Sequence, residues 1–385
     1  MKSHIAEFVS PGHPDRLADG IVESIVDLAV GRDADALVGV ECAVHTDHVF
    51  IDGRIAAGVG DACAVRHEEI DEIARKVYRD AGYGGKWIHA PEKLKVIQNV
   101  CLEPLSDEER AIRNLSDDQN VVAGYACNHP ETDYLPPAHF VANYIGRKVD
   151  AWRRTVSGKF GPDFKVLVHL DDKDGRYKWR RLTLSIQHQA GVFPAEQHEL
   201  VLPVVRGALA ELEARGLAGI SDLLLDDFVL NGAGDFIVGG PEGDNGLSGK
   251  KLAVDFYGPE VPIGGGAICG KDPHKVDVAG AFRARELALR LLKERISPER
   301  SEPRKRSLDG CGNAVTVRLG WTPGDAAPAF REAESVDSLG LAHPIPFSAM
   351  PPEDWFRIDT IVSDMRLDCL DRRARMLSGY FFNIA

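Results

Sequence analysis

A glycine-rich segment near residue 270 has the composition of a phosphate-binding loop. It reads VPIGGGAICGKDPHKVD from Val261 to Asp277, between a predicted strand and a predicted helix. Glycines there, including Gly265 and Gly266, let backbone N–H groups approach an anion without interference from a β-carbon. Lys271 and Lys275 follow at a spacing that places them on one helical face. The segment therefore predicts a site for a polyphosphate.

Acidic residues in the same segment predict a helix cap and a metal ligand. Asp272 is placed to cap the following helix, with Pro273 in its first turn, and Asp277 is a candidate ligand for a divalent ion. The string from Gly265 to Lys271 matches G-x-x-x-x-G-K, but Asp272 replaces the Ser or Thr that binds magnesium in a P-loop, which excludes an ordinary P-loop. The alternative is a glycine-rich turn with two solvent-facing lysines. The density of glycine, lysine and aspartate favours the phosphate site.

The sequence SPGHPDRLAD, from Ser10 to Asp19, predicts the start of a second chemically active helix. Pro14 suits the first helical position, and the helix N-terminus presents the positive end of the dipole. His13 is able to donate to a leaving oxygen, and Asp15 and Asp19 are able to hold a divalent ion. The alternative is a capped helix with solvated carboxylates, since Asp is favoured in first turns.

A third concentration of glycine lies between Phe236 and Gly258, where the chain reads FIVGGPEGDNGLSGKKLAVDFYG. These glycines predict a compact loop that points Asp244 inward and brings Lys250 and Lys251 to one side. The alternative is a flexible hairpin.

Hydrophobic spacing predicts the elements that position these residues. Apolar residues from Leu17 to Leu28 recur at helical spacing, so a helix is expected over Pro14–Gly31. Two β-rich runs, Ala36–Thr46 and His48–Ile55, predict an antiparallel hairpin, and a helix is expected over Glu68–Ala81. The order helix, hairpin, helix favours an α+β fold over a doubly wound nucleotide fold.

A polar stretch from Leu105 to Asn120 predicts a long surface loop and a domain boundary. Beyond it we expect helices at Ala138–Arg153, Glu196–Arg215 and Pro273–Arg295, and strands at Lys165–Leu170, Arg181–Gln187 and Lys251–Phe256. The charged run Ser297–Ser307 predicts a linker. We therefore predict three pseudo-symmetric α+β domains, at residues 1–104, 115–229 and 231–385.

The bulk composition restricts the kinds of partner. The chain has 385 residues and a formal net charge of −13, which argues against broad attachment to nucleic acid or anionic lipid. Its seven cysteines are scattered and lack a C-x-x-C pair, so we expect neither a disulfide framework nor a zinc site. The start lacks a secretory leader pattern, and no segment approaches the roughly 18 apolar residues of a membrane span. We expect a soluble, cytoplasmic protein.

Taken together, the three glycine- and aspartate-bearing segments resemble S-adenosylmethionine synthetases. The patterns GHPD, GGPxGDxGLxGxK and GGGAxxGKDPxKVD occur in the family's order, and so do the patches Gly124-Tyr125-Ala126, Glu131-Thr132-Asp133 and Gln187-His188. The resemblance fades after about Arg295. It implies three α+β domains of one pseudo-symmetric fold, and a homodimer or homotetramer with active sites at the subunit interface. It also implies two Mg²⁺ ions per site and K⁺.

The resemblance implies a two-step reaction as well. The sulfur of L-methionine attacks C5′ of ATP and expels triphosphate, which is then cleaved to pyrophosphate and phosphate. Because a thioether is a neutral nucleophile, catalysis should come mainly from positioning and from stabilising the charge on the leaving triphosphate.

Positions that match the family's motifs take the roles that the resemblance implies. The catalytic residues would be His13, at the departing oxygen, Lys165, near the same bond, and Lys271. ATP and its phosphates would be held by Phe236, Asp163, Asp244, Lys250, Lys251, Gly265, Gly266 and Lys275. L-Methionine would contact Asp118, Asp244 and Lys275. Asp15 and Asp277 would bind Mg²⁺, and Glu41 would bind K⁺.

Four features depart from the family's pattern. The run Leu115–Asn120 lacks the glycines of the usual G-A-G-D-Q-G loop, which predicts different loop mobility. Arg54 stands where a carboxylate that helps hold methionine is expected, which predicts an inverted local charge. Lys250 replaces an arginine that grips triphosphate, and Arg16 replaces a lysine. Loss of the bidentate fork at position 250 predicts slower triphosphate cleavage.

Two other functions remain open at this point. One is a related enzyme that uses a different nucleophile or only hydrolyses triphosphate, as Arg54 and the altered loop suggest. The other is a non-catalytic nucleotide-binding paralogue. The retention of His13, Lys165, Lys271 and Asp277 argues against the second, because binding alone does not need the imidazole and the full set of cations.

Overall fold

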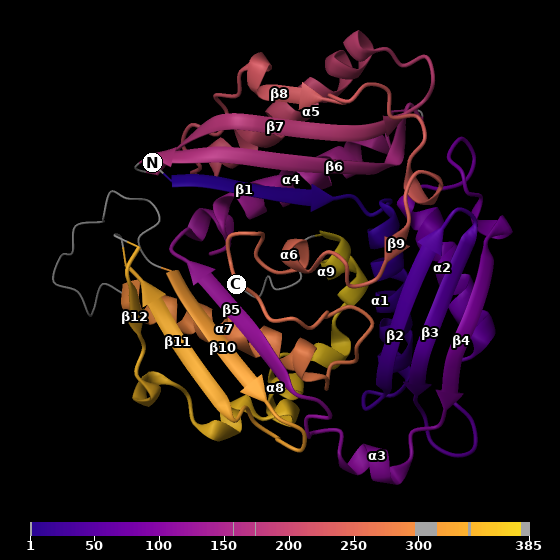
Figure 1. Cartoon of the computed structure of the whole chain (residues 1–385), viewed down its shortest axis with the longest axis vertical. Helices are drawn as coiled ribbons and strands as arrows, with labels where there is room; N and C mark the ends of the chain where they lie inside the picture. Colours follow the sequence, from indigo (N-terminus) through magenta and orange to yellow (C-terminus); the bar gives the residue numbers. More distant parts are fainter. Residues whose placement is uncertain (1, 157, 174, 297–313, 338–339, 379–385) are drawn as a thin grey trace.

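A computed structural model describes residues 2–156, 158–173, 175–296, 314–337 and 340–378. The named strands in these ranges form three four-stranded sheets that surround a group of helices (Figure 1). This arrangement confirms the predicted α+β class. None of the helices in the described ranges is long and apolar enough to cross a membrane. The predicted linker Ser297–Ser307 lies outside these ranges.

The sheet nearest the N-terminal helix has the order β4-β3-β2-β9. Its strands are β2 (Leu37–His45), β3 (His48–Ala56), β4 (Lys95–Glu103) and β9 (Gly246–Leu247), and its helices are α1 (Pro14–Arg32) and α2 (His67–Ala81). β2 and β3 pair antiparallel from His45↔His48 onward, which confirms the predicted hairpin. Leu17, Ile21 and Ile25 are fully buried on the face of α1 that packs against β2, as the helical spacing requires.

The other two sheets repeat this plan, with one long helix against each. The second sheet contains β1 (Lys2–Val9), β6 (Phe160–Lys173), β7 (Arg176–His188) and β8 (Phe228–Leu230), with α4 (Pro137–Arg153) against it and α5 (Pro194–Ala214) against α4. The third contains β5 (Asn120–Cys127), β10 (Ala314–Trp321), β11 (Phe330–Val336) and β12 (Ala342–Pro344), with α7 (Val276–Ile296) against it. Shorter helices are α3 (Asp107–Ala111), α6 (Leu252–Asp255), α8 (Ile358–Asp364) and α9 (Arg372–Ser378).

Each sheet combines strands that are distant in the sequence. β1 pairs with β6, β5 pairs with β10, and β9 pairs with β2. Four of these strands, β1, β5, β9 and β10, were not expected from the sequence, and each pairs with a strand that is distant in the chain. The division into consecutive domains stays a prediction, and the sheets themselves are interleaved along the chain.

Two local predictions were wrong. The expected strand Lys251–Phe256 is instead the helical turn α6, in which Asp255 N–H donates to the Lys251 carbonyl at 2.9 Å. Residues 254–257 are all buried, and a strand would turn alternate side chains outward, so the helical turn suits the site better. The expected loop Leu105–Asn120 contains the short helix α3, which begins with a capping box between Ser106 and Glu109.

The start of α7 also differs from the prediction. The helix begins at Val276, so Lys271 and Lys275 lie before it rather than on one helical face. Asp272 is fully buried and does not cap this helix. Its carboxylate accepts from His274 N–H in the turn before α7 at 2.9 Å, from Val38 N–H of β2 at 2.8 Å and from the Arg113 side chain. Asp272 therefore ties the glycine-rich segment to the first sheet.

Candidate active site

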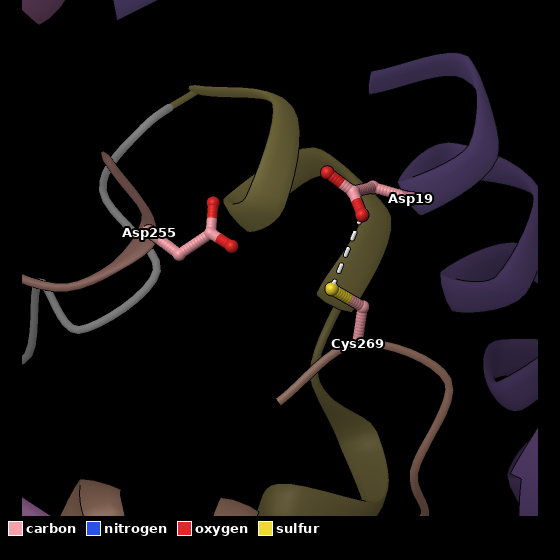
Figure 2. A group of neighbouring side chains, drawn as sticks. All are labelled: Asp19, Asp255 and Cys269. Atoms are coloured by element: carbon pink, nitrogen blue, oxygen red, sulfur yellow. Dashed lines mark hydrogen bonds between the residues drawn. The ribbon is translucent and has the colours of Figure 1, made fainter. Parts of the chain in front are cut away.

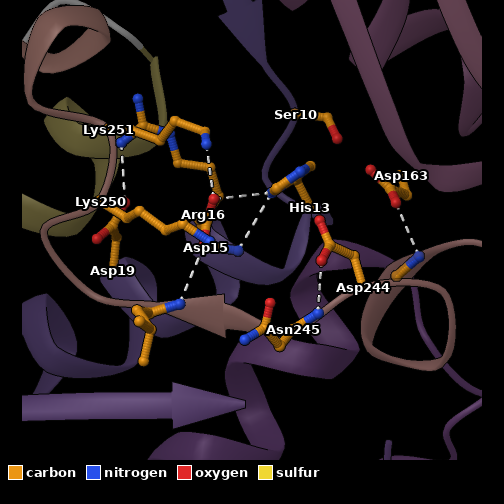
Figure 3. Close-up of polar contacts among 12 residues, drawn as sticks. Ser10, His13, Asp15, Arg16, Asp19, Asp163, Asp244, Asn245, Lys250 and Lys251 are labelled. Carbon is orange, nitrogen blue, oxygen red and sulfur yellow. Dashed lines mark hydrogen bonds and ion pairs between the residues drawn. The ribbon is translucent and has the colours of Figure 1, made fainter. Parts of the chain in front are cut away.

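The N-terminus of α1 fixes the protonation state of His13. His13 is the N-cap residue, and its Nδ1 accepts from the backbone N–H of Asp15 at 3.1 Å (Figure 3). Burial and the nearby Lys165 ammonium lower the pKa of His13 to about 3, so the ring is neutral at physiological pH. Because Nδ1 is an acceptor, the single ring proton lies on Nε2. His13 is therefore a neutral hydrogen-bond donor.

Asp15 binds cations from the third glycine-rich segment. Its carboxylate lies 2.7 Å from Lys251 Nζ and 3.7 Å from Lys250 Nζ, and it accepts from Leu247 N–H at 3.0 Å (Figure 3). Burial raises the pKa of Asp15, but the Lys251 hydrogen bond and the other contacts outweigh it and the net pKa is lowered. The ionised carboxylate and the two lysines form a charged cluster beside His13.

Asp163 and Asp244 lie on the other side of His13 in Figure 3. Asp163 is buried and accepts from Gly240 N–H at 2.7 Å. Burial raises the pKa of Asp163 to about 6, and Lys165 partly opposes this. Asp244 is exposed and accepts from the next backbone N–H, that of Asn245, at 2.8 Å. Phe236 packs beside Gly239, one residue before the Asp163 contact. We call these residues the histidine group: His13, Asp15, Asp163, Lys165, Phe236, Asp244, Lys250 and Lys251.

The remaining predicted residues gather around the glycine-rich segment. Lys271 Nζ lies 2.9 Å from Asp277 Oδ1, and Lys275 pairs with Asp117. A cavity of about 1190 Å³ opens beside them, lined among others by Glu41, Gly265, Gly266 and Lys271. Asp118 is exposed and accepts from Gln119 N–H at 2.7 Å. We call this set the glycine-loop group: Glu41, Asp118, Gly265, Gly266, Lys271, Lys275 and Asp277.

The two groups are separate within one chain. Among the described residues, ion pairs and hydrogen bonds join members within a group and none joins the side chains of one group to those of the other. The glycine-rich segment meets α1 at Asp19, whose Oδ1 lies 3.2 Å from Cys269 Sγ, and at Glu23, whose Oε1 accepts from Gly270 N–H at 2.8 Å. Glu23 lies about 15 Å along the helix axis from His13. Within the described part of one chain, His13 and Lys271 therefore share no hydrogen bond or ion pair.

A buried cluster behind the histidine group contains Asp19, one of the two carboxylates of the first helix that were expected to hold a divalent ion. Asp19, Asp255 and Cys269 lie close together, with the Cys269 thiol 3.2 Å from Asp19 Oδ1 (Figure 2). Arg16 places one guanidinium nitrogen against both carboxylates. This guanidinium already supplies the positive charge, and Asp19 also accepts from Gly249 N–H at 2.9 Å. Asp19 therefore fastens the lysine-bearing segment to α1, and its role as a metal ligand stays a prediction.

Arg54 does not invert the local charge as predicted. Its guanidinium donates to Glu103 at 2.8 and 3.0 Å and to Glu109 at 2.7 Å. Two carboxylates surround one cation, so the net charge there remains negative. This pairing could not be predicted from the sequence, because Glu109 lies on α3, in the stretch that was expected to be a loop. Asp117, the partner of Lys275, was missed for the same reason.

Glycine is required at one position of the phosphate segment and not at another. Gly270 has φ +74°, and a β-carbon there would collide with the Val40 carbonyl. We expect Gly270→Ala to lower the free energy of unfolding by about 2–4 kcal/mol. Gly265→Ala is the matched control, because no atom lies within 4 Å of its added β-carbon, and should cost less than about 1 kcal/mol. Urea unfolding measures both, and equal losses would contradict this account.

Comparisons with known proteins place the chain in a family. Family models described as S-adenosylmethionine synthetase, N-terminal domain and C-terminal domain, match residues 2–102 and 238–301. The S-adenosylmethionine synthase of Paramagnetospirillum magneticum is 35% identical over 298 residues, which cover 74% of this chain and 71% of the relative. That of Zymomonas mobilis is 31% identical over 338 residues, covering 84% and 78%.

A solved structure supports the fold along the whole chain. An unusual S-adenosylmethionine synthetase from Campylobacter jejuni superposes with a TM-score of 0.77 at 21% identity, covering 100% of this chain and 94% of that one. At that identity the likeness concerns the fold alone. The sequence relatives carry the assignment further. The chain belongs to the S-adenosylmethionine synthetase family, whose members are methionine adenosyltransferases.

Proposed function

We propose that the protein forms S-adenosylmethionine from ATP and L-methionine, by displacement of triphosphate from C5′ and later cleavage of that triphosphate. The observation that carries the proposal is the neutral His13, whose Nε2 proton is available beside Asp15 and Lys251. A neutral donor strengthens its hydrogen bond as negative charge develops on the leaving oxygen. A permanently charged imidazolium would bind substrate and transition state more equally.

The lysines of both groups would stabilise the triphosphate. Lys250 and Lys251 surround Asp15, and Lys271 pairs with Asp277. Each group thus holds a carboxylate and an ammonium together, which is the set that a metal–phosphate complex requires. Asp15 and Asp277 would bind Mg²⁺, and Glu41, exposed in the cavity, would bind K⁺. Bound Mg²⁺ supplies neutralisation of phosphate charge.

The remaining residues would orient the nucleoside and the amino acid. Lys165 is exposed on β6 next to His13 and would stabilise the same leaving oxygen. Asp163 and Phe236 would hold the nucleoside, and Asp118, Asp244 and Lys275 would hold L-methionine. Lys275 and Asp117 would separate when the substrate carboxylate binds. The main contribution of these residues to catalysis would be to position the sulfur in line with C5′.

A second copy of the chain would complete the site. Since the histidine group and the glycine-loop group do not meet within one chain, we propose that they meet between the two subunits of a homodimer. Large apolar side chains are exposed on strands of every sheet: Ile5, Phe50, Ile97, Val121, Leu167, Leu247 and Phe330. Burial of such surfaces between copies favours association. The dimer could pair further into a tetramer.

One assay separates this proposal from its alternatives. Purified protein is incubated with ATP, L-methionine, Mg²⁺ and K⁺, and S-adenosylmethionine is measured by mass spectrometry. Accumulation of the product supports the proposal. ATP loss without that product would indicate another nucleophile or triphosphate hydrolysis, and ATP binding without turnover would indicate a non-catalytic paralogue.

A further inference from the structure

Residues 268–271 of the glycine-rich segment include Lys271 and lie outside the named helices and strands. Strand β2 holds the backbone on both sides of Lys271, which forms an antiparallel bridge with Gly39, and Asp272 N–H donates to the Val38 carbonyl at 3.2 Å. Gly270 carbonyl accepts from Val40 N–H at 2.9 Å, and Gly270 N–H donates to Glu23 Oε1 at 2.8 Å. The carbonyls of Ile268 and Lys271 still require a donor, because buried carbonyls are nearly always hydrogen-bonded.

Arg372, the first residue of α9, supplies that donor. Its Nη2 lies 3.2 Å from the Ile268 carbonyl and 2.9 Å from the Lys271 carbonyl. Its Nε lies 3.1 Å from Glu23 Oε2, and both side chains of this ion pair are 1% exposed or less. One guanidinium therefore joins both sides of Gly270 to α1.

Further contacts along α9 attach this helix to α1. Asp27 of α1 accepts from the backbone N–H groups of Arg372 and Arg373 at 3.3 Å. Met376 sulfur accepts from Arg16 Nη1 at 3.4 Å. Arg16 is next to Asp15 in the chain, so α9 contacts α1 near the histidine group as well as near Lys271. These contacts fix where the guanidinium of Arg372 stands.

The chemistry of this position requires arginine. A guanidinium presents several N–H donors in a rigid plane and so reaches two carbonyls and a carboxylate at once, which one ammonium does less well. Burial raises the pKa of Glu23 to about 7, and Arg372 opposes that shift by favouring the ionised form. The arginine and the glutamate, both buried, thus depend on each other.

We propose that Arg372 is a positioning residue for the reaction: from the C-terminal helix α9 it holds the backbone of residues 268–271, and thereby Lys271, in the orientation that binds the triphosphate. It touches no substrate itself. It lies beyond both matched family segments, 2–102 and 238–301. The expected effect of Arg372 on the reaction rate rests on the proposed function. Its effect on how rigidly residues 268–271 are held rests on the structure alone.

The test compares four variants of the full-length protein. Arg372→Met removes all side-chain hydrogen bonds, and Arg372→Lys keeps the charge. Arg373→Gln is the control on the same helix, since the Arg373 side chain pairs with Asp80 at 2.8 Å and contacts no loop carbonyl. Glu23→Gln combined with Arg372→Met removes the buried charge that the single change leaves unpaired, so it separates folding stability from loop position.

We expect Arg372→Met to lower kcat/KM for ATP by about 10- to 100-fold with less than about a threefold change in KM for L-methionine. Hydrogen exchange of the amides at 268–271 should accelerate by about tenfold or more. In Arg372→Lys, both kcat/KM and the exchange rate should lie between those of Arg372→Met and the wild type. In Arg373→Gln, both should stay within about twofold of the wild type. The double variant should regain thermal stability relative to Arg372→Met without regaining kcat/KM or exchange protection.

Wild-type exchange rates and kcat/KM in Arg372→Met would overturn the proposal. Wild-type exchange rates and kcat/KM in the double variant would overturn it as well, because Arg372 would then serve only as the counter-ion of Glu23. If the wild-type protein makes no S-adenosylmethionine, the proposed function fails, while the exchange measurement still decides whether Arg372 orders the loop.

Discussion

Asparagine in place of His13 is expected to lower kcat by about 10²- to 10³-fold while the Kd for ATP changes by less than about threefold. The amide oxygen of asparagine is able to cap Asp15 N–H as Nδ1 does at 3.1 Å, so α1 should keep its start. The shorter side chain cannot extend a donor to the position of Nε2. The transition state loses a hydrogen bond that ground-state binding scarcely uses.

Steady-state kinetics and calorimetric ATP binding measure these two effects. His169→Asn is the control, because His169 lies on β6 and belongs to neither group. Its ring forms a hydrogen bond with Ser3 Oγ of β1 at 2.8 Å. An unchanged kcat in His13→Asn would remove His13 from catalysis, and loss of ATP binding would make it a binding residue only.

The pH dependence of this variant has a definite sign. In the folded protein the pKa of His13 is lowered to about 3 from 6.5, so the unfolded chain takes up the proton first as pH falls. The stability from neutral His13 is complete above about pH 6.5 and is lost as pH falls toward 3. Urea unfolding from pH 7 to 4 should therefore show a smaller decline in His13→Asn than in the wild type.

Glutamine in place of Lys271 is expected to lower kcat/KM for ATP by about 10³-fold, mostly through loss of charge opposite the triphosphate. The ammonium lies 2.9 Å from Asp277 at the cavity and is about one-third exposed, with relative exposure of 32%. The variant removes the ammonium that pairs with Asp277 and that would also neutralise the phosphates. Tripolyphosphate, tested as an inhibitor, should lose affinity in parallel.

Two controls accompany the Lys271 variant. Lys271→Arg keeps the charge and should retain more activity than Lys271→Gln, and Lys93→Gln removes an exposed lysine of neither group and should behave as wild type. Equal kcat/KM values in Lys271→Gln and wild type would place the triphosphate elsewhere.

The sequence was sufficient for features that depend on neighbours in the chain. The start of α1 at the HPD triplet follows from proline at the first helical position, and the β2–β3 hairpin follows from two β-rich runs joined by a short turn. The lysines and aspartates of both groups followed from the motifs. Their separation into two groups did not, because it depends on where α1 meets the glycine-rich segment.

Predictions failed where a distant partner decides the local structure. Residues 252–255 form a helical turn because Asp255 must reach Arg16, 239 positions away. Asp272 looks like a helix cap but bonds Val38 and Arg113. Arg372 lies in a segment with no motif, and only its contacts with Glu23 and the loop carbonyls reveal it. Local patterns carry no information about such tertiary contacts.

The most direct test of the two-group site mixes two inactive proteins. His13→Asn and Lys271→Gln chains, each with its own tag, are co-expressed, and mixed dimers are purified by both tags. Each mixed dimer should contain one site with an intact histidine group from one chain and an intact glycine-loop group from the other. Such dimers should therefore form S-adenosylmethionine at about half the wild-type rate. Mixed dimers as inactive as either parent would contradict a site shared between copies.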